Sequence, residues 1–328
     1  MSLKRYCPHK TQATIHPVEP FDAIADAGIL CEVTRRSNVD EKSIIEVLTN
    51  RGIIQRLEIA KMYRAYHGHP LLSDLKSRIS GNLWNVIAAL MTPLPHYYAK
   101  EIHDAIVARA TDEDVIIEIL CTLSNYGVVT IAESYEELYG KTLENDLRDN
   151  TSGAFAKLSV ALCQGKRNEN HVIDHAQAKS DAQKLFEVGG KLWSAEDSHF
   201  NQIIITHSYP QLAQTFLEYE NMSGDDIEVP IEKAFSGNIK RAILAIVKCV
   251  KSKIGFFSGR LHAAMQGIGT NDRTLIRIVV SRSEIDLGDI KSVFERRYGK
   301  SLESWIAGDT SGDYKKALLS IVSTYPDY

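Results

Sequence analysis

The stretch SGDYKKALLSIV, residues 311–322, is the last of four related segments; the earlier ones are SGNLWNVIAALM from Ser80, SGAFAKLSVALC from Ser152 and SGNIKRAILAIV from Ser236. Upstream of each lies an acidic start followed by an apolar helical pattern: VDEKSIIEVL, TDEDVIIEIL, AEDSHFNQII and TNDRTLIRIV. The residue before each acidic start precedes its Ser-Gly serine by 42 positions in every copy, at Asn38, Ala110, Ser194 and Gly269. Four matches at one spacing indicate an internal repeat of about 70 residues.

Each unit has the pattern of several short amphipathic helices, so the sequence predicts an all-α fold. In repeat 2, for example, apolar residues follow a helical spacing, and Gly140 and the Ser-Gly turn end successive helices. Asn-Gly hairpins and sustained period-2 alternation, which would indicate strands, are missing. We expect a tail at 1–21, repeats at 22–93, 94–166, 181–252 and 253–328, and a polar connector at 167–180.

Composition excludes several classes of protein. The 328 residues carry 38 basic and 42 acidic side chains, a net charge of −4, which does not fit a general nucleic-acid binder. Five scattered cysteines without a CxxC pair fit a reducing compartment better than a disulfide framework. The sequence shows neither a signal-peptide core nor an apolar run long enough to span a bilayer. We therefore expect a cytoplasmic protein that reaches membranes only from their surface.

The combined pattern resembles the annexin family. A Met-x-Gly-x-Gly-Thr loop, an acid about 40 residues later and then a Ser-Gly turn belong to a four-repeat scheme that covers about residues 22 to 325. Stretches such as ILCTLSNYG and KSKIGFFSGRLH look most like arthropod annexins. The resemblance implies four repeats of five short helices in a curved disc, whose convex calcium loops dock on anionic phospholipid. It places the tail on the concave side, where it could meet protein partners.

Repeat 4 contains the residues that a calcium site needs. A hard cation takes about 6–8 oxygen ligands, and glycine adopts the backbone angles that turn successive carbonyls outward. In MQGIGT, we expect the carbonyls of Met265, Gly267 and Gly269 to bind calcium, with the Asp309 carboxylate supplying charge. Water or a lipid phosphoryl oxygen would complete the shell. The sequence also places Thr270, like Thr111 in repeat 2, as the cap of the next helix.

The other three repeats depart from this pattern. At the carboxylate position, repeat 1 has Arg78, a cation, whereas repeats 2 and 3 have the uncharged Asn150 and Ala234. We therefore expect one competent calcium site in place of four. The remaining changed loop positions are Thr34, Arg36 and Asn38 in repeat 1, Ala108 and Ala110 in repeat 2, and Ser194, near the retained Gly189 and Gly190, in repeat 3.

Basic residues now stand in these degenerate loops. Each is worth about 1 kcal/mol near an anionic leaflet, so they could partly replace lost calcium bridges, or they could simply be solvated. Trp193 could insert at the interface, or be a half-buried core residue. The candidates for lipid contact are thus Arg35, Arg36, Arg109, Lys191 and Trp193. The pairs His67 with His69 and His171 with His175 have metal-like spacing, but no third ligand completes either one.

Two hypotheses for function follow. The first is calcium-dependent binding to anionic phospholipid membranes, with one intact site in repeat 4 and a peripheral location when calcium rises. The alternative is an annexin-fold scaffold with weak or calcium-independent membrane binding that acts through protein contacts or self-association. No Ser-His-Asp arrangement or carboxylate pair has support from spacing, so an enzyme is not expected.

Overall fold

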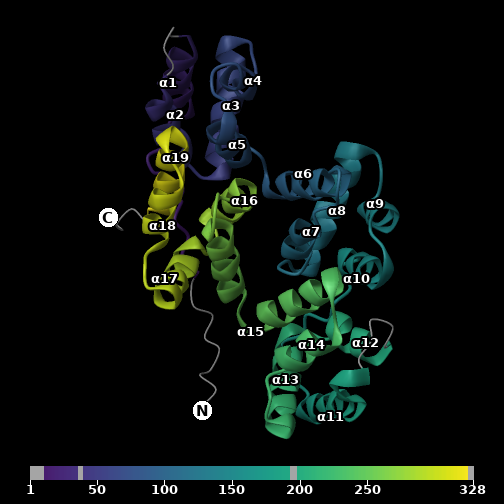
Figure 1. Ribbon diagram of the computed structural model, residues 1–328. Coiled ribbons are helices and arrows are strands. Elements are labelled where there is room, and N and C mark those ends of the chain that lie inside the picture. The colour runs from purple at the N-terminus through teal and green to yellow at the C-terminus, as the bar shows by residue number, and fades with distance from the viewer. Residues whose placement is uncertain (1–10, 36–39, 193–197, 324–328) are drawn as a thin grey trace. The chain divides into compact units, whose positions relative to one another are not determined.

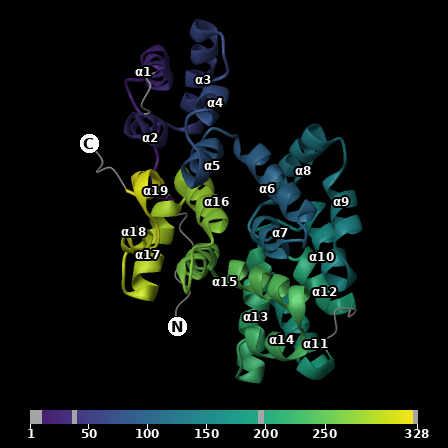
Figure 2. The same cartoon turned by 45° about the horizontal axis from the view of Figure 1, so that its top comes forward.

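The structure is a computed structural model that describes residues 11–35, 40–192 and 198–323 (Figures 1 and 2). Those residues form nineteen α-helices and no strand, which confirms the all-α prediction. The chain divides into two compact units. Unit 1 comprises residues 1–93 and 257–328, and unit 2 comprises residues 94–256. Repeats 1 and 4 therefore share unit 1, and repeats 2 and 3 share unit 2.

Five helices form repeat 1 and four complete helices belong to repeat 4 in unit 1. They are α1 Ala23–Arg35, α2 Glu41–Thr49, α3 Ile53–His67, α4 Leu71–Lys76, α5 Gly81–Leu90, α16 Asp272–Ser283, α17 Leu287–Tyr298, α18 Leu302–Asp309 and α19 Gly312–Val322.

The helices of unit 2 follow the same order. They are α6 Leu94–Val107, α7 Glu113–Leu120, α8 Asn125–Tyr139, α9 Leu143–Asn150, α10 Gly153–Cys163, α11 His175–Leu192, α12 Ser198–Thr206, α13 Tyr209–Ser223 and α14 Glu228–Ala234, and then α15 Gly237–Met265, whose residues from 257 onward belong to unit 1.

Helix α15 is two helices in sequence. Ser252 has an extended backbone, with φ −167° and ψ 104°, and its hydroxyl accepts a hydrogen bond from the Gly255 amide at 2.9 Å, as an N-cap does. The first half of α15 is thus the fifth helix of repeat 3, and the second half is the first helix of repeat 4. This division confirms the prediction of five helices in each repeat.

The Ser-Gly glycines have one conformation in all four repeats. Their φ angles lie between 60° and 62°, in the left-handed region where a side chain would clash with the backbone. This turn starts the fifth helix of every repeat, so a local signal explains why the pair recurs. The four residues are Gly81, Gly153, Gly237 and Gly312.

Repeats 1 and 4 share one apolar core in unit 1. Helices α2 and α5 pack against α16 and α19, although about 200 residues of chain separate the two pairs. Aliphatic side chains from all four helices are fully buried there, each contributing about 1.5–3 kcal/mol to stability. They include Ile44, Leu48, Val86, Ile87, Leu275, Ile278, Leu318 and Ile321.

The described part of the N-terminal segment also joins repeats 1 and 4. The Thr14 amide donates to the Ser283 carbonyl at 2.7 Å, and the Gly288 amide donates to the Gln12 carbonyl at 2.8 Å. A Cβ at Gly288 would lie 2.9 Å from Gln12, so only glycine allows this approach. Further along, the Gln55 side chain bonds the backbone of Val18 in both directions.

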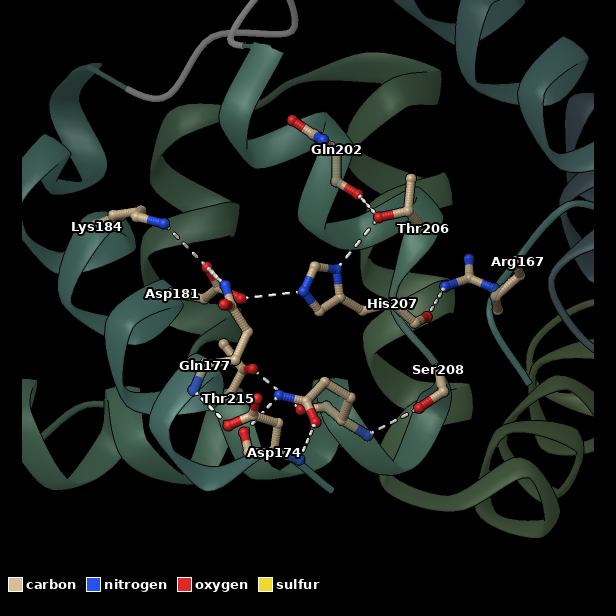
Figure 3. A network of polar contacts seen from close by, with 11 residues as sticks. Arg167, Asp174, Gln177, Asp181, Lys184, Gln202, Thr206, His207, Ser208 and Thr215 are labelled. Carbon is tan, nitrogen blue, oxygen red and sulfur yellow. Dashed lines mark hydrogen bonds and ion pairs between the residues drawn. The ribbon is translucent and has the colours of Figure 1, made fainter. Parts of the chain in front are cut away.

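The connector between repeats 2 and 3 is fastened to its own unit by polar contacts (Figure 3). Arg167 donates through Nη1 to the carbonyls of Ile204 and His207, both at 2.8 Å. The Gln211 amide exchanges two hydrogen bonds of 2.9 Å with the backbone of Asp174. The polar composition of this segment therefore reflects specific hydrogen bonds.

Candidate calcium site

Loop 4, residues 266–271, joins α15 to α16 in unit 1 and has the backbone that the sequence predicts. Gly267 and Gly269 have φ angles of 109° and 84°, which a residue with a side chain adopts only under strain. Met265, the last residue of α15, is buried. The Asn271 amide donates to the Ala264 carbonyl at 2.7 Å and closes the loop.

Asp309 lies at this loop although it is 40 residues beyond Gly269. It is the last residue of α18, and the Thr270 hydroxyl donates to its Oδ2 at 2.5 Å and to its carbonyl oxygen at 3.1 Å. The structure thus brings together Met265, both glycines and the carboxylate. The donor set of neutral carbonyls and one carboxylate fits calcium, which prefers oxygen ligands.

The two threonines do not cap helices, so that prediction was wrong. Asn271 caps α16, because its Oδ1 accepts from the Thr274 amide at 3.0 Å, and Asp112 precedes α7. Thr270 and Thr111 instead bond the residue at the carboxylate position of their own repeat. Short-range capping patterns cannot detect a partner about 40 positions away.

Two carboxylates lie close to the Tyr314 hydroxyl beside loop 4. Burial, followed by the neighbouring carboxylate of Asp272 and then that of Asp309, raises the pKa of the Tyr314 hydroxyl above its ordinary value. One of these two carboxylates, Asp309, is the predicted calcium ligand. Sequence reasoning did not single out Asp272, which opens α16.

Ile268, at the tip of loop 4, is another residue that sequence reasoning missed. Its side chain is fully exposed, at 109% of the reference area, between the two left-handed glycines. It stands at the loop position that Trp193 occupies in repeat 3. A large aliphatic residue between loop glycines was the signal that could have identified it.

Loop 2, residues 108–112, is closed by the same two hydrogen bonds as loop 4 but has different backbone angles. The Asp112 amide donates to the Ala105 carbonyl at 3.0 Å, and the Thr111 hydroxyl donates to the Asn150 carbonyl at 3.1 Å. Among the described residues only glycines have positive φ, so Ala108 and Ala110 do not take the angles of loop 4. The side-chain amide of Asn150 donates to the backbone carbonyl of Asp146, in the same helix, at 2.9 Å.

Repeat 1 places a cation where repeat 4 has its carboxylate. The Arg78 Nε donates to the Thr34 carbonyl at 2.8 Å, and Thr34 corresponds to Met265. Arg35, the last residue of α1, is exposed. Arg36 and Asn38 lie outside the described residues.

Repeat 3 is described only in part around its loop. Gly189, Gly190 and Lys191 lie within α11, and Ala234 is the last residue of α14. Trp193 and Ser194 lie outside the described residues. The side chain of Arg109, the basic candidate in repeat 2, is exposed.

A polar hollow of about 590 Å³ lies beside the connector in unit 2 and is lined in part by His175 and His207. Two of its lining residues contact the buried Asp181 carboxylate, which accepts from Gln177 at 2.8 Å and lies 3.0 Å from His207 Nε2 (Figure 3). The described residues contain no group of three or more histidine, cysteine or acidic side chains that could hold a metal. Much of this polar lining is used in hydrogen bonds that hold the connector.

Comparison with known proteins accounts for the repeated loop and turn. The sequence model of the Annexin family matches residues 25–90, 97–162, 180–246 and 256–321. The chain belongs to the annexin family. Annexins generally bind phospholipid in a calcium-dependent manner. The limits of the repeats chosen from the sequence and the likeness to arthropod annexins remain predictions.

Individual relatives support the assignment. Human annexin A7 is 43% identical over 312 residues, which cover 95% of this chain and 64% of annexin A7. Human annexin A4 is 41% identical over 306 residues, 93% of this chain and 96% of that protein. This annexin therefore spans less than two thirds of annexin A7 but nearly all of annexin A4.

Solved structures give the same result. The structure of annexin III matches with a TM-score of 0.92 and 40% identity over 95% of this chain and 97% of that chain. Calcium-bound annexin (Sm)1 matches with a TM-score of 0.84 and 29% identity over 96% and 94% of the two chains. Annexin homologues thus include a calcium-bound protein. In the part of the chain that the structure describes, no helix has both the length and the apolar character to cross a bilayer.

Proposed function

We propose that this annexin binds anionic phospholipid membranes in a calcium-dependent manner through a single calcium site in repeat 4. The observation that carries the proposal is the pairing of two left-handed glycines with Asp309, which Thr270 holds at the same loop. The carbonyls of Met265, Gly267 and Gly269 and the Asp309 carboxylate would bind the ion. Bound calcium would supply the positive charge that a lipid phosphate needs at this surface.

One carboxylate gives the site little negative charge. Three carbonyls and a bidentate carboxylate provide five oxygens, fewer than the 6–8 that calcium takes. Water fills the remaining positions in solution, and a phosphoryl oxygen would replace it at a membrane. Lipid therefore adds the second charged ligand, which makes calcium binding and membrane binding depend on each other.

Side chains outside the metal shell add contacts. Ile268 is placed to enter the interface, because it is fully exposed at the tip of the loop that would hold the ion. Arg35 and Arg109 are exposed and would meet lipid phosphates, together with Arg36, Lys191 and Trp193, which the sequence nominates. We infer a cytoplasmic protein that becomes peripheral at membranes when calcium rises.

A second candidate function is an annexin-fold scaffold with little regulated lipid binding. It is favoured by the loss of the carboxylate in three of four repeats, at Arg78, Asn150 and Ala234. Such a protein would act through self-association on membranes or through partners of the N-terminal tail.

Co-sedimentation of the intact protein with phosphatidylserine vesicles separates the two functions. With calcium we expect additional binding that excess EGTA removes, and with phosphatidylcholine vesicles we expect little binding. If calcium changes nothing, whether the protein is bound or free, the first function is wrong and the scaffold is favoured.

A further inference from the structure

Repeat 1 has an arginine, Arg78, at the position where repeat 4 has its carboxylate. Arg78 stands 40 residues after Asn38, as Asp309 stands 40 residues after Gly269. Its Nε donates to the carbonyl of Thr34 at 2.8 Å. Thr34 corresponds to Met265, whose carbonyl is the first ligand of the site proposed in repeat 4. A side-chain cation thus touches the backbone oxygen that calcium would use.

Thr34, which accepts this hydrogen bond from Arg78, is itself held by burial and by hydrogen bonds. Thr34 is 8% exposed, and its hydroxyl bonds the Cys31 carbonyl at 3.0 Å and the Tyr63 hydroxyl at 2.9 Å. Tyr63 in turn donates to Asp74 Oδ2 at 2.8 Å, so α1, α3 and α4 are joined at this point. The Thr34 carbonyl lies in the last turn of α1, where unpaired carbonyls and the helix dipole favour a cation.

The guanidinium is part of the chain and is always present, unlike a bound ion, whose occupancy follows the calcium concentration. Arg35 directly follows Thr34, ends α1 and is exposed. By holding the end of α1, Arg78 also fixes the backbone from which Arg35 projects. Repeat 2 offers no such device, because Asn150 is neutral and its amide bonds its own helix.

We propose that Arg78 is a built-in replacement for calcium in repeat 1. It positions Arg35 so that this repeat binds the phosphate groups of an anionic phospholipid surface without calcium. The inference rests on the proposed membrane function, but it concerns a different repeat and the opposite dependence on calcium. Arg78 is a positioning residue, and Arg35 makes the lipid contact.

The test measures binding of the full chain to phosphatidylserine–phosphatidylcholine vesicles in excess EGTA at low salt. The parent should bind weakly, and Arg35→Ala and Arg78→Met should each lower the association constant about five-fold, the effect of one basic residue at an anionic surface. Arg78→Lys should retain most of the binding, because it keeps the cation. Lys61→Ala, which removes an exposed charge of α3 in the same repeat, should change it little.

A double variant distinguishes positioning from charge alone. If Arg78 acts through Arg35, adding Arg78→Met to Arg35→Ala should cost less than about two-fold more. A further five-fold loss would overturn the positioning role. Parent protein that does not bind in EGTA, or Arg35→Ala and Arg78→Met variants that bind like the parent, would overturn the whole inference.

Repeating the vesicle-binding measurement with calcium distinguishes failure of this inference from failure of the proposed calcium-dependent function. All repeat 1 variants should retain the extra binding that calcium produces, which also shows that unit 1 has folded. Asp309→Ala should lose that extra binding and keep the EGTA-resistant part. If the parent gains nothing from calcium but the EGTA results hold, the repeat 4 function fails and the Arg78 inference stands.

Discussion

Loops 2 and 4 are closed by the same hydrogen bonds, but we propose a calcium site only in loop 4. In each, one backbone hydrogen bond spans the loop, and a threonine hydroxyl bonds the carbonyl of the residue at the carboxylate position, at 3.1 Å in both. They differ in two glycines, which are alanines in loop 2, and in Asp309, which is Asn150 there. The fold thus supplies the same closing hydrogen bonds in both repeats, and we propose that φ and charge at three positions decide whether a cation can bind.

The largest effect should come from the carboxylate. Asp309→Ala removes the only charged protein ligand proposed for loop 4 and should abolish the calcium-dependent part of vesicle binding. Asn150→Ala should change it little, because loop 2 already lacks the glycine backbone. Co-sedimentation on phosphatidylserine vesicles measures both variants. The reverse result, with Asn150→Ala impaired and Asp309→Ala normal, would mean that loop 2 is the working site.

Lipid should tighten calcium binding by at least about ten-fold. Without lipid, a site with one carboxylate should have a dissociation constant on the order of 10⁻⁴–10⁻³ M, as in weakly charged calcium modules. A phosphoryl oxygen adds a charged ligand and lowers it. Isothermal titration with and without short-chain phosphatidylserine tests this, and several equivalent submicromolar sites in the lipid-free protein would contradict the contrast between loops.

The backbone angles should matter next. Gly269→Ala places a side chain at a φ of 84°, which costs about 1–2 kcal/mol and should raise the calcium concentration for half-maximal binding about five- to thirty-fold. Ala110→Gly is the matched change in loop 2 and should give no new site, since Asn150 adds no charge. A calcium titration of vesicle binding measures both variants. An unaffected Gly269→Ala variant would show that the left-handed angle is not needed.

A smaller effect is expected at the loop tip. Ile268→Ser should weaken calcium-dependent membrane affinity about five-fold, corresponding to partial burial of one aliphatic side chain in the interface. Calcium binding in solution should stay the same, because the side chain supplies no ligand. Val107→Ser in repeat 2, which alters another exposed apolar residue, is the control and should bind like the parent. Equal losses in both variants would point to a general effect of surface hydrophobicity.

The smallest effect on calcium is expected in repeat 1. Arg78→Glu supplies a carboxylate at the right position, but Arg36 and Asn38 remain where repeat 4 has glycines, so no calcium site should appear. The same change removes the bond to the Thr34 carbonyl and should lower thermal stability slightly. Calcium titration of this variant together with Asp309→Ala isolates repeat 1, and recovered calcium-dependent binding would show that charge alone makes the site.

The sequence by itself determined the four repeats, through motifs that recur at one spacing, and the all-α class, through local signals. Apolar residues at helical spacing predict each helix, and the Ser-Gly glycines are needed where φ is left-handed. The same holds for the glycines of loop 4, because Gly267 and Gly269 adopt positive φ angles that their residue type favours. The helices and the glycine turns could therefore be predicted from neighbouring positions alone.

Only the tertiary structure decided which distant groups meet. It joins repeat 1 to repeat 4 in one core, brings Thr270 to Asp309 instead of to a helix start, and places Arg78 on the Thr34 carbonyl. Each of these contacts spans about 40 residues or more and depends on the direction in which a side chain leaves its helix. Sequence spacing showed that Arg78 had replaced an acid, but only packing showed that its charge reaches the oxygen calcium would have used.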